Sequence, residues 1–501
     1  MTEQSTKQAA KKRYQRWIEL ILFLFLLFSY AYILPRWADW SQNSRLDLTL
    51  AIVDTGKLSI DTYYQNTGDY AHFEGHYYTD KAPGPSFLGV PVYAAIRPIL
   101  QSQPFKQVIS KMALIPAFTD TLQEEGSGLL EAKIYTFIVL VAVTFFVIMV
   151  PSAWLGVLLF RMVQDLGITT GWALAITLIY GLATNVFTYS AGFFSHQLAA
   201  FLLFGAFYIA YKIHKREMPQ WWATIAGFML AMAIISEYPA FLIALGVFAY
   251  LAWALPNRRW LTGAILAGVI PGIVLAAYDF AIFHTILPIG YQYSELYIQE
   301  GGPHTTGFLS LTYPHVDALW GLTFGSYRGL FFVSPVLLLA LSGLIWGWRI
   351  KTWRLEWAVC TWSVVSFYLF YASSVMWEGG YAVGPRYLVP MLPFLALGFA
   401  GIIREWGITR WTRWLTAILT IWSVVVVWAQ TIAGQNYPDW TLNPLVNYAL
   451  PRLIAGDIAR NLGMVLSLRG WVSMAPYFIV SLGLILVLVS LVHRGEKFRS
   501  A

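Results

Sequence analysis

The sequence DTYYQNTGDYAHFEGHYYTDKAPG, from Asp61 to Gly84, is a long polar stretch in a chain that is otherwise mostly apolar. It holds three aspartates, two histidines, five tyrosines and one lysine, and it follows the first apolar run of the sequence. Hydrophobic residues make up 58% of the 501 residues and charged residues only 12%, whereas soluble domains average about 25% charged residues. The composition predicts an all-α polytopic membrane protein in which this segment lies between the first two membrane spans.

Apolar runs of about 20 residues are long enough to cross a bilayer as helices. We predict about twelve such spans, at residues 17–34, 133–163, 169–187, 193–213, 220–236, 238–255, 259–282, 328–348, 355–373, 386–404, 411–432 and 471–492. Residues 85–101 are also apolar but contain Pro91, Arg97 and Pro98. We therefore expect an amphipathic helix at the membrane interface there, not a span.

The basic residues predict the orientation of the chain. With the N-terminus in the cytoplasm, 20 of the 33 Lys and Arg residues fall in short cytoplasmic segments, as the positive-inside rule requires. The net charge of +7 is then a topology signal and not the footprint of a nucleic-acid partner. We expect a multi-pass protein of the plasma (inner) membrane, with both termini cytoplasmic and the functional site extracytoplasmic.

The predicted organisation is a cytoplasmic basic tail at 1–16, a single transmembrane domain at 17–493 and a second cytoplasmic tail at 494–501. Long extracytoplasmic loops are expected at 35–132, 283–327 and 433–470. The one cysteine, Cys360, lies within an apolar run. A disulfide framework and a cysteine-based metal site are therefore excluded.

Two parts of the sequence follow a known family pattern. The first comprises NSRLDLTLAIVDTGKLSID (43–61) and GHYYTDKAPGPSFLGVPVYA (75–94), and the second is WEGGYAVGPRYL (377–388). These motifs resemble the GT-C superfamily of membrane glycosyltransferases, in particular the protein O-mannosyltransferase-like enzymes and the lipid A aminoarabinose transferases. The resemblance implies a GT-C-like fold with a large catalytic first loop. It also implies transfer of a monosaccharide from a polyprenyl-phosphate donor to a lipid-linked glycan, cell-surface glycan or protein.

Such a transfer needs a carboxylate that accepts the proton of the acceptor hydroxyl. In the family an acidic residue stands just after the first span, where this chain has Ser41 and Gln42. We therefore rank four first-loop carboxylates as candidate bases, in the order Asp47, Asp69, Asp39 and Asp61. On an expected helix over 43–55, Arg45 would pair with Asp47 and lower its pKa. The alternative for each candidate is a solvated loop carboxylate or a helix cap.

The departing phosphate needs positive charge close to it. We expect this charge from Lys81, whose direction would be set by the turn at Pro83-Gly84, and from Arg386. Arg45 and Arg328 are further candidates. The alternatives are a lysine that contacts lipid headgroups and an arginine that snorkels to the interface.

Further substrate-binding residues are expected among Asp80, Tyr77, Tyr78, Glu237, His196 and Glu378. Glu237 equally fits a cap on a helix broken at Pro239, and His196 equally fits an interfacial histidine. No metal or other cofactor is required. A divalent metal is compatible with the chemistry but is not indicated, because His72, Glu74 and His76 lie in a segment that looks extended.

The predicted partners are a polyprenyl-phosphate sugar donor, membrane lipids and a glycan, lipid or protein acceptor, with no nucleic acid. Two alternative functions stay open at this point. One is a transporter or flippase of a lipid-linked sugar, which would place polar residues near the bilayer midplane. The other is a non-catalytic assembly protein, which would not need acidic and basic residues to converge.

Overall fold

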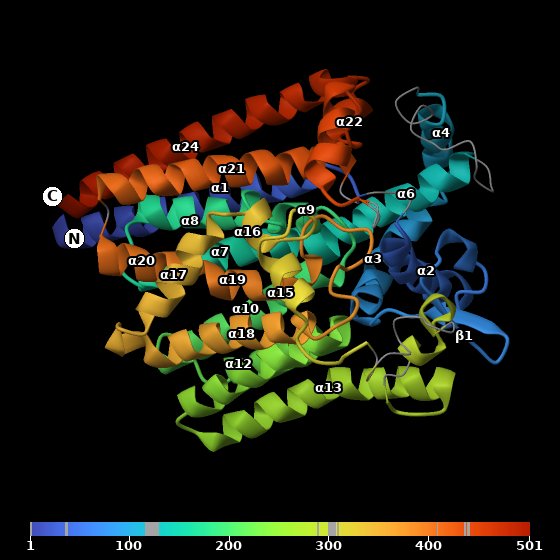
Figure 1. Cartoon of the computed structure of the whole chain (residues 1–501), viewed down its shortest axis with the longest axis horizontal. Coiled ribbons are helices and arrows are strands. Elements are labelled where there is room, and N and C mark those ends of the chain that lie inside the picture. The colour runs from blue at the N-terminus through green and yellow to red at the C-terminus, as the bar shows by residue number, and fades with distance from the viewer. Residues whose placement is uncertain are drawn as a thin grey trace.

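The structure, a computed structural model, describes residues 3–35, 39–115, 130–287, 290–298, 307, 310–407, 409–434, 437 and 441–500. It is mostly helical, with 75% of its residues in helices. The long helices, among them α1, α13, α21 and α24, run along one direction and form an elongated bundle (Figure 1). The described strands are confined to a small hairpin at one end of the bundle.

The first half of the chain contains α1 (Glu3–Tyr32), α2 (Trp40–Thr55), η1 (Tyr64–Asn66), β1 (Tyr70–Phe73), β2 (His76–Thr79), α3 (Gly84–Leu100), α4 (Gln103–Met112), α6 (Leu130–Thr144), the π-helix η2 (Phe145–Met149), α7 (Val150–Asp165), α8 (Thr170–Leu182), α9 (Val186–Ser190), α10 (Ser195–His214), α11 (Trp222–Ser236), η3 (Tyr238–Ala240) and α12 (Phe241–Ala254).

The second half contains α13 (Arg258–Phe283), η4 (Gly290–Tyr293), α14 (Glu295–Ile298), α15 (Val316–Thr323), α16 (Leu330–Val333), α17 (Leu337–Gly347), η6 (Lys351–Trp353), α18 (Arg354–Ala372), η7 (Arg386–Met391), α19 (Leu392–Ala396), α20 (Gly398–Trp406), α21 (Arg410–Gly434), the π-helix η8 (Leu445–Ala449), α22 (Leu450–Ile454), α23 (Leu462–Val465), η9 (Gly470–Met474) and α24 (Ala475–Ser500).

Eight helical stretches of the described chain are long and apolar enough to cross a membrane. They are Lys12–Tyr32, Ala132–Asp165, Ser195–His214, Arg258–Phe283, Lys351–Ala372, Arg386–Trp406, Arg410–Gly434 and Gly470–Gly495. Four shorter apolar helices lie where further spans were predicted: Thr170–Leu182, Trp222–Ser236, Tyr238–Ala254 and Leu337–Gly347. The membrane character is therefore confirmed, whereas the count of twelve spans and the loop layout stay predictions.

Local sequence explains why one predicted span is shorter in the structure. Residues 328–348 form α16 and α17 instead of one continuous helix, and Pro335 lies between them. Proline lacks the backbone N–H that continues a helix, and it disfavours the helical conformation of the residue before it.

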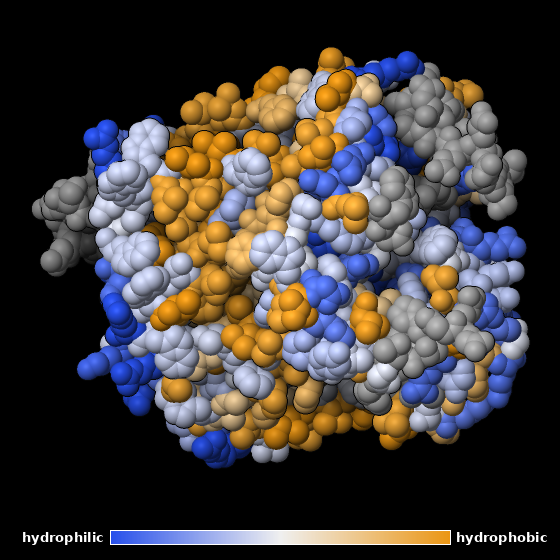
Figure 2. Space-filling model, viewed as in Figure 1, coloured by the Kyte–Doolittle hydropathy of each residue, from blue (hydrophilic) through white to orange (hydrophobic). Residues whose placement is uncertain are grey.

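The surface has the distribution expected for a protein that crosses a membrane. Apolar residues cover the middle of the face in Figure 2, and hydrophilic residues gather towards both ends of the bundle. Outward-facing side chains on α13, α21 and α24 are apolar and well exposed, among them Ile273, Ile421 and Ile479. Helix α1 begins and helix α24 ends at the same end of the bundle, and the polar elements α2, β1 and α3 lie at the opposite end (Figure 1).

The polar segment forms a helix, a hairpin and a second helix. Asp39 caps α2 by accepting a hydrogen bond from the backbone N–H of Gln42 at 2.9 Å, and Gly56 ends this helix with φ 68°. Strands β1 and β2 pair antiparallel, with Tyr70 opposite Thr79, and the two-residue turn Glu74-Gly75 has positive φ at both positions. This is the combination that tight hairpin turns require. The extended conformation predicted for this stretch is confirmed.

Gly84 begins α3 and fixes where the Asp80–Gly84 motif lies in the fold. A Cβ atom on Gly84 would lie 2.8 Å from the Cα of Ser236, at the C-terminal end of α11. Only glycine permits such close backbone contact. The motif is thereby held beside Glu237, the residue that follows α11. The predicted helix over 85–101 is confirmed as α3, and its position at a membrane interface stays a prediction.

Candidate functional site

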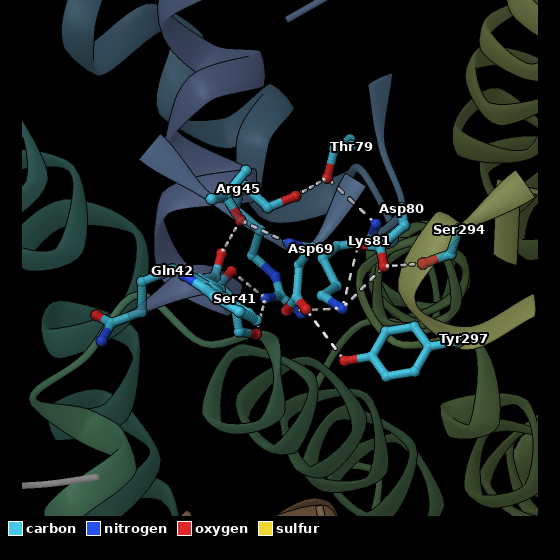
Figure 3. Close-up of polar contacts among 12 residues, drawn as sticks. Ser41, Gln42, Arg45, Asp69, Thr79, Asp80, Lys81, Ser294 and Tyr297 are labelled. Carbon is cyan, nitrogen blue, oxygen red and sulfur yellow. Dashed lines mark hydrogen bonds and ion pairs between the residues drawn. The ribbon is translucent and has the colours of Figure 1, made fainter. Parts of the chain in front are cut away.

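Lys81 lies at the centre of the polar cluster, between two carboxylates (Figure 3). Its Nζ lies 3.0 Å from Oδ2 of Asp69 and 3.1 Å from Oδ1 of Asp80. The hairpin explains this arrangement, because Asp69 directly precedes β1 and Asp80 directly follows β2, so that the two residues extend the register of Tyr70 and Thr79. All three charged side chains are almost completely buried.

A remote segment completes the surroundings of these carboxylates. The hydroxyl of Tyr297 on α14 donates a hydrogen bond to Asp69 Oδ1 at 3.1 Å, and the hydroxyl of Ser294 donates to Asp80 Oδ2 at 3.0 Å. The ammonium of Lys81 also lies 5.7 Å from the centre of the Tyr297 ring. Neither residue was predicted, because nothing in the local sequence connects 294–297 with the first loop.

The two carboxylates have opposite protonation tendencies. Burial by itself would raise the pKa of Asp69, but Lys81, Arg386 and the hydroxyl of Tyr297 lower it overall. Burial raises the pKa of Asp80, and the charge of Asp69 raises it further. Burial would lower the pKa of Lys81, but its two carboxylate neighbours raise it well above its usual value.

A second group of polar side chains contains Arg45 on α2 and Glu237. Nη1 of Arg45 donates to the backbone oxygen and the hydroxyl of Ser41 at 2.6 and 2.7 Å, and its Nη2 donates to the hydroxyl of Ser195 at 3.1 Å. The Ser195 hydroxyl in turn donates to Glu237, whose Oε2 lies 3.1 Å from Nδ1 of His196. Ser195 therefore connects a buried cation to a buried carboxylate.

Arg386, the first residue of η7, is the third cation near this site. Its guanidinium lies 6.0 Å from the Phe194 ring and 5.2 Å from the Tyr387 ring, and it interacts electrostatically with Asp69 and Asp39. Its Nε is buried and has no hydrogen-bond partner. Arg386 is thus attracted by nearby carboxylates and keeps one N–H, that of Nε, without an acceptor.

Tyr291 shows that the two groups of polar residues belong to one region. The carboxylates of Asp80 and Glu237 and the cations of Lys81 and Arg45 all act electrostatically on its hydroxyl. Tyr291 lies in η4, which comes from the segment after α13. The site is therefore assembled from α2, the hairpin, α10, the α11–η3 junction, η4, α14 and η7.

Other predicted site residues lie elsewhere. Asp47 is buried on the face of α2 opposite Arg45, and within the described part of the chain its Oδ1 accepts a hydrogen bond from Asn66 Nδ2 at 3.2 Å. The expected pairing of Arg45 with Asp47 is wrong, because residues two apart on a helix point in different directions. Burial raises the pKa of Asp47 well above its usual value instead of lowering it.

Asp61 lies on the outer side of the hairpin, where it accepts hydrogen bonds from the backbone N–H of Tyr77 and from Ser59 and contacts His76 at 2.8 Å. Tyr77 stacks on Tyr64 with ring centres 3.9 Å apart, and Tyr78 packs near Phe283. These contacts stabilise the hairpin, and none of them reaches Lys81.

Arg328 is completely buried, and its guanidinium donates to the backbone oxygens of Glu378 and Gly380 at 3.1 and 2.7 Å. It therefore holds the loop before η7 in place and has the contacts of a structural residue. Glu378 is half-buried in that loop.

The described residues contain no group of three or more His, Cys, Asp or Glu side chains that would suit a metal ion. His72, Glu74 and His76 have separate partners: Nδ1 of His72 lies 2.8 Å from Glu295, Nδ1 of His76 lies 2.8 Å from Asp61, and Glu74 is near His284. The extended hairpin separates their side chains, as its sequence indicated.

No family model matches this sequence, and no curated protein matches it at a significant level. The fold itself defines the class of the protein, which is a multi-pass α-helical membrane protein with a buried polar site at one end of its bundle.

Proposed function

We propose that the protein is a GT-C-like glycosyltransferase that moves a monosaccharide from a polyprenyl-phosphate donor to a lipid-linked glycan, cell-surface glycan or protein. The observation that carries the proposal is the convergence of Lys81, Arg45 and Arg386 with buried carboxylates at one end of an apolar bundle. We infer that a lipid-linked anion reaches these cations at this end of the bundle while its tail stays in the bilayer. The proposal includes the plasma membrane as location, cytoplasmic termini and an extracytoplasmic site.

The reaction explains why cations are needed. The acceptor oxygen forms a bond to the anomeric carbon of the sugar, and the bond between that carbon and the phosphate oxygen breaks. The donor phosphodiester carries one negative charge, and the departing phosphomonoester gains a second. Lys81 supplies a compact charge, and Arg386 supplies a planar fork with a free Nε donor. Both stabilise the charge that grows during the transfer.

Asp69 is the candidate base that the geometry supports best. Among the four ranked carboxylates it alone makes an ion pair with Lys81, and it also lies within electrostatic reach of Arg386. A donor phosphate that attracts Lys81 would weaken the Lys81–Asp69 pair and make Asp69 a stronger base. Asp39 is the second candidate, since it also interacts with Arg386. Asp47 and Asp61 have other partners in the first loop, namely Asn66 and His76.

The proposal is tested with purified protein in vesicles and a radiolabelled polyprenyl-phosphate sugar. Lys81→Ala and Arg386→Ala are expected to reduce transfer by about 100-fold or more, as the loss of one preorganised charge contact does in other enzymes. Lys57→Ala, which removes an exposed lysine of the same loop, is the matched control and should leave transfer unchanged. Unchanged transfer in both site variants would refute the site.

The alternative, a flippase for a lipid-linked sugar, is separated by the same preparation. A flippase would move the labelled lipid between leaflets without cleaving it, so that the label would stay on the polyprenyl phosphate. Loss of the sugar from the lipid, with a stoichiometric gain on an acceptor, supports the transferase. No transfer from any polyprenyl-phosphate sugar would refute the proposed function.

A further inference from the structure

The segment between α21 and α24 carries an unusual line of exposed apolar side chains. Val446, Leu450 and Ile454 follow one another at intervals of four residues in η8 and α22, a spacing that keeps side chains on about the same side of a helix. Leu442 lies four residues earlier, just before η8. Leu442 is 79% exposed and Ile454 86% exposed. Single exposed apolar residues are common, but exposed apolar residues that recur along one segment mark a site that meets another apolar surface.

The apolar surface continues after α22. Leu466, Trp471 and Val472 are exposed beyond it, and Ile479 and Leu482 continue the same character along the first turns of α24. Helix α24 is one of the helices long and apolar enough to cross a membrane. Along the chain, the exposed apolar residues of 442–472 thus lead into a helix that is long and apolar enough to face lipid.

The orientation of α22 differs from that of its neighbours. Helices α21 and α24 run along the bundle, whereas α22 lies across it, at the end where α2 and the hairpin are also found (Figure 1). A helix that lies across the end of a set of spanning helices is parallel to the membrane plane. The indole N–H of Trp471 donates to the backbone oxygen of Leu453 at 2.9 Å and joins η9 to α22 in this position.

The polar groups of the segment lie where an interfacial helix would place them. Arg452 forms an ion pair with Asp457 at 2.6 Å and donates to the hydroxyl of Tyr448 at 2.7 Å, so that its charge is matched within the segment itself. Ala449 and Leu453 face inwards and are buried. The segment therefore has one face packed on the protein and one apolar face without a protein partner.

We propose that the 442–472 segment docks on the lipid bilayer, with Leu442, Val446, Leu450 and Ile454 inserted at the boundary of headgroups and acyl chains on the same side as the polar site. This inference adds a membrane-docking surface to the extracytoplasmic loop predicted at 433–470. It does not depend on the proposed function. Its role is to fix the depth of the bundle end, and with it the level of the polar site, in the membrane.

The test uses single-cysteine labelling of the full-length protein in phosphatidylcholine vesicles. The natural Cys360 is buried, so the protein without an added cysteine serves as the unlabelled background. Ile454→Cys and Val446→Cys carry an environment-sensitive fluorophore, and Lys57→Cys, at an exposed site in the polar first loop, is the control. The two readouts are quenching by acyl-chain nitroxide lipids and quenching by aqueous iodide.

We expect nitroxide lipids to quench the labels at 446 and 454 strongly, with iodide access about an order of magnitude below that of the control, because interfacial helices bury their apolar face roughly 5–10 Å deep. Ile454→Asp should restore iodide access to a label at 446. Open iodide access at both positions, with no lipid quenching, would overturn the proposal. Protection from both quenchers would also overturn it, since it would mean that another protein surface covers the segment.

Discussion

Replacement of Lys81 by methionine tests the charge balance of the buried cluster without any assumption about catalysis. Methionine keeps most of the volume of the side chain but removes the ammonium that lies 3.0 Å from Asp69 and 3.1 Å from Asp80. At these distances each attraction is about 5 kcal/mol for an effective dielectric constant of 20. The full sum is not lost, because a carboxylate deprived of its cation takes up a proton instead.

The cost of that proton sets the size of the effect. Holding one carboxyl protonated at pH 7, against an ordinary pKa of about 3.9, costs about 4 kcal/mol. We therefore expect Lys81→Met to lower the free energy of unfolding by about 4 kcal/mol at pH 7, which agrees with roughly 3–5 kcal/mol for breaking a buried ion pair. Lys57→Met, at an exposed lysine, should change it by less than about 0.5 kcal/mol.

The dependence on pH provides the sharper criterion. In the variant the shared carboxyl has a raised pKa, so the folded state holds a proton that the unfolded state releases above pH ~4. Stability relative to the wild type must then fall as pH rises, from a deficit of about 2 kcal/mol at pH 5.5 to about 5 kcal/mol at pH 7.5. Adding Asp80→Asn should remove most of the deficit, because Asp69 keeps Arg386 and Tyr297 as neighbours.

The assay is reversible unfolding in mixed micelles, followed by tryptophan fluorescence at several pH values. A deficit that stays the same from pH 5.5 to 7.5 would refute the idea that the two carboxylates compete for one proton. A variant as stable as the wild type at pH 7.5 would show that Lys81 does not neutralise them at all.

Two further outcomes follow from other buried polar groups. Asp47→Asn should stabilise the protein above pH ~4 and make its stability decline less as pH rises, because burial raises the pKa of this carboxyl and the amide avoids the cost of ionising it. Thermal unfolding across pH 5 to 8 measures this dependence, and an unchanged slope would contradict the prediction. Ser195→Ala should lower the free energy of unfolding by about 1–3 kcal/mol, because Glu237 and Arg45 lose their common hydrogen-bond partner. Unfolding in mixed micelles measures this loss, and it would be smaller if water replaced the hydroxyl.

Much of the fold follows from local sequence. The positions of most apolar helices, the hairpin between 70 and 79 and helix α3 were all predictable, because each depends on composition and turn residues within a short window. The break between α16 and α17 at Pro335 follows equally from local rules. The number of spans is harder to predict, since the four shorter apolar helices have 11 to 17 residues and a helix of that length crosses a membrane only if its surroundings accommodate it.

Only part of the candidate site could be predicted from neighbouring residues in the sequence. Proximity of Asp69 to Lys81 depends on hairpin register, which the turn at Glu74-Gly75 encodes. The opposite faces of Arg45 and Asp47 could have been derived from helix geometry alone. By contrast, Tyr297 reaches Asp69 from more than 200 residues away along the chain. No short-range pattern reports such a contact.

The contacts that each of the three cations already makes indicate which cation a phosphate binds first. Lys81 is held by two carboxylates, and Arg45 is held by Ser41 and, through Ser195, by Glu237. An anion must compete with these contacts before it gains anything from either cation. The buried Nε atoms of Arg45 and Arg386 both lack a hydrogen-bond partner. The Nη atoms of Arg45 are held by Ser41 and Ser195, whereas Arg386 has a contact with Tyr387 and the longer-range attraction of Asp69 and Asp39. An unsatisfied buried donor is costly, so a phosphate oxygen that accepts from the Nε of Arg386 removes that cost. Binding should therefore begin at Arg386, and the Lys81–Asp69 pair should loosen only as the phosphate moves further in.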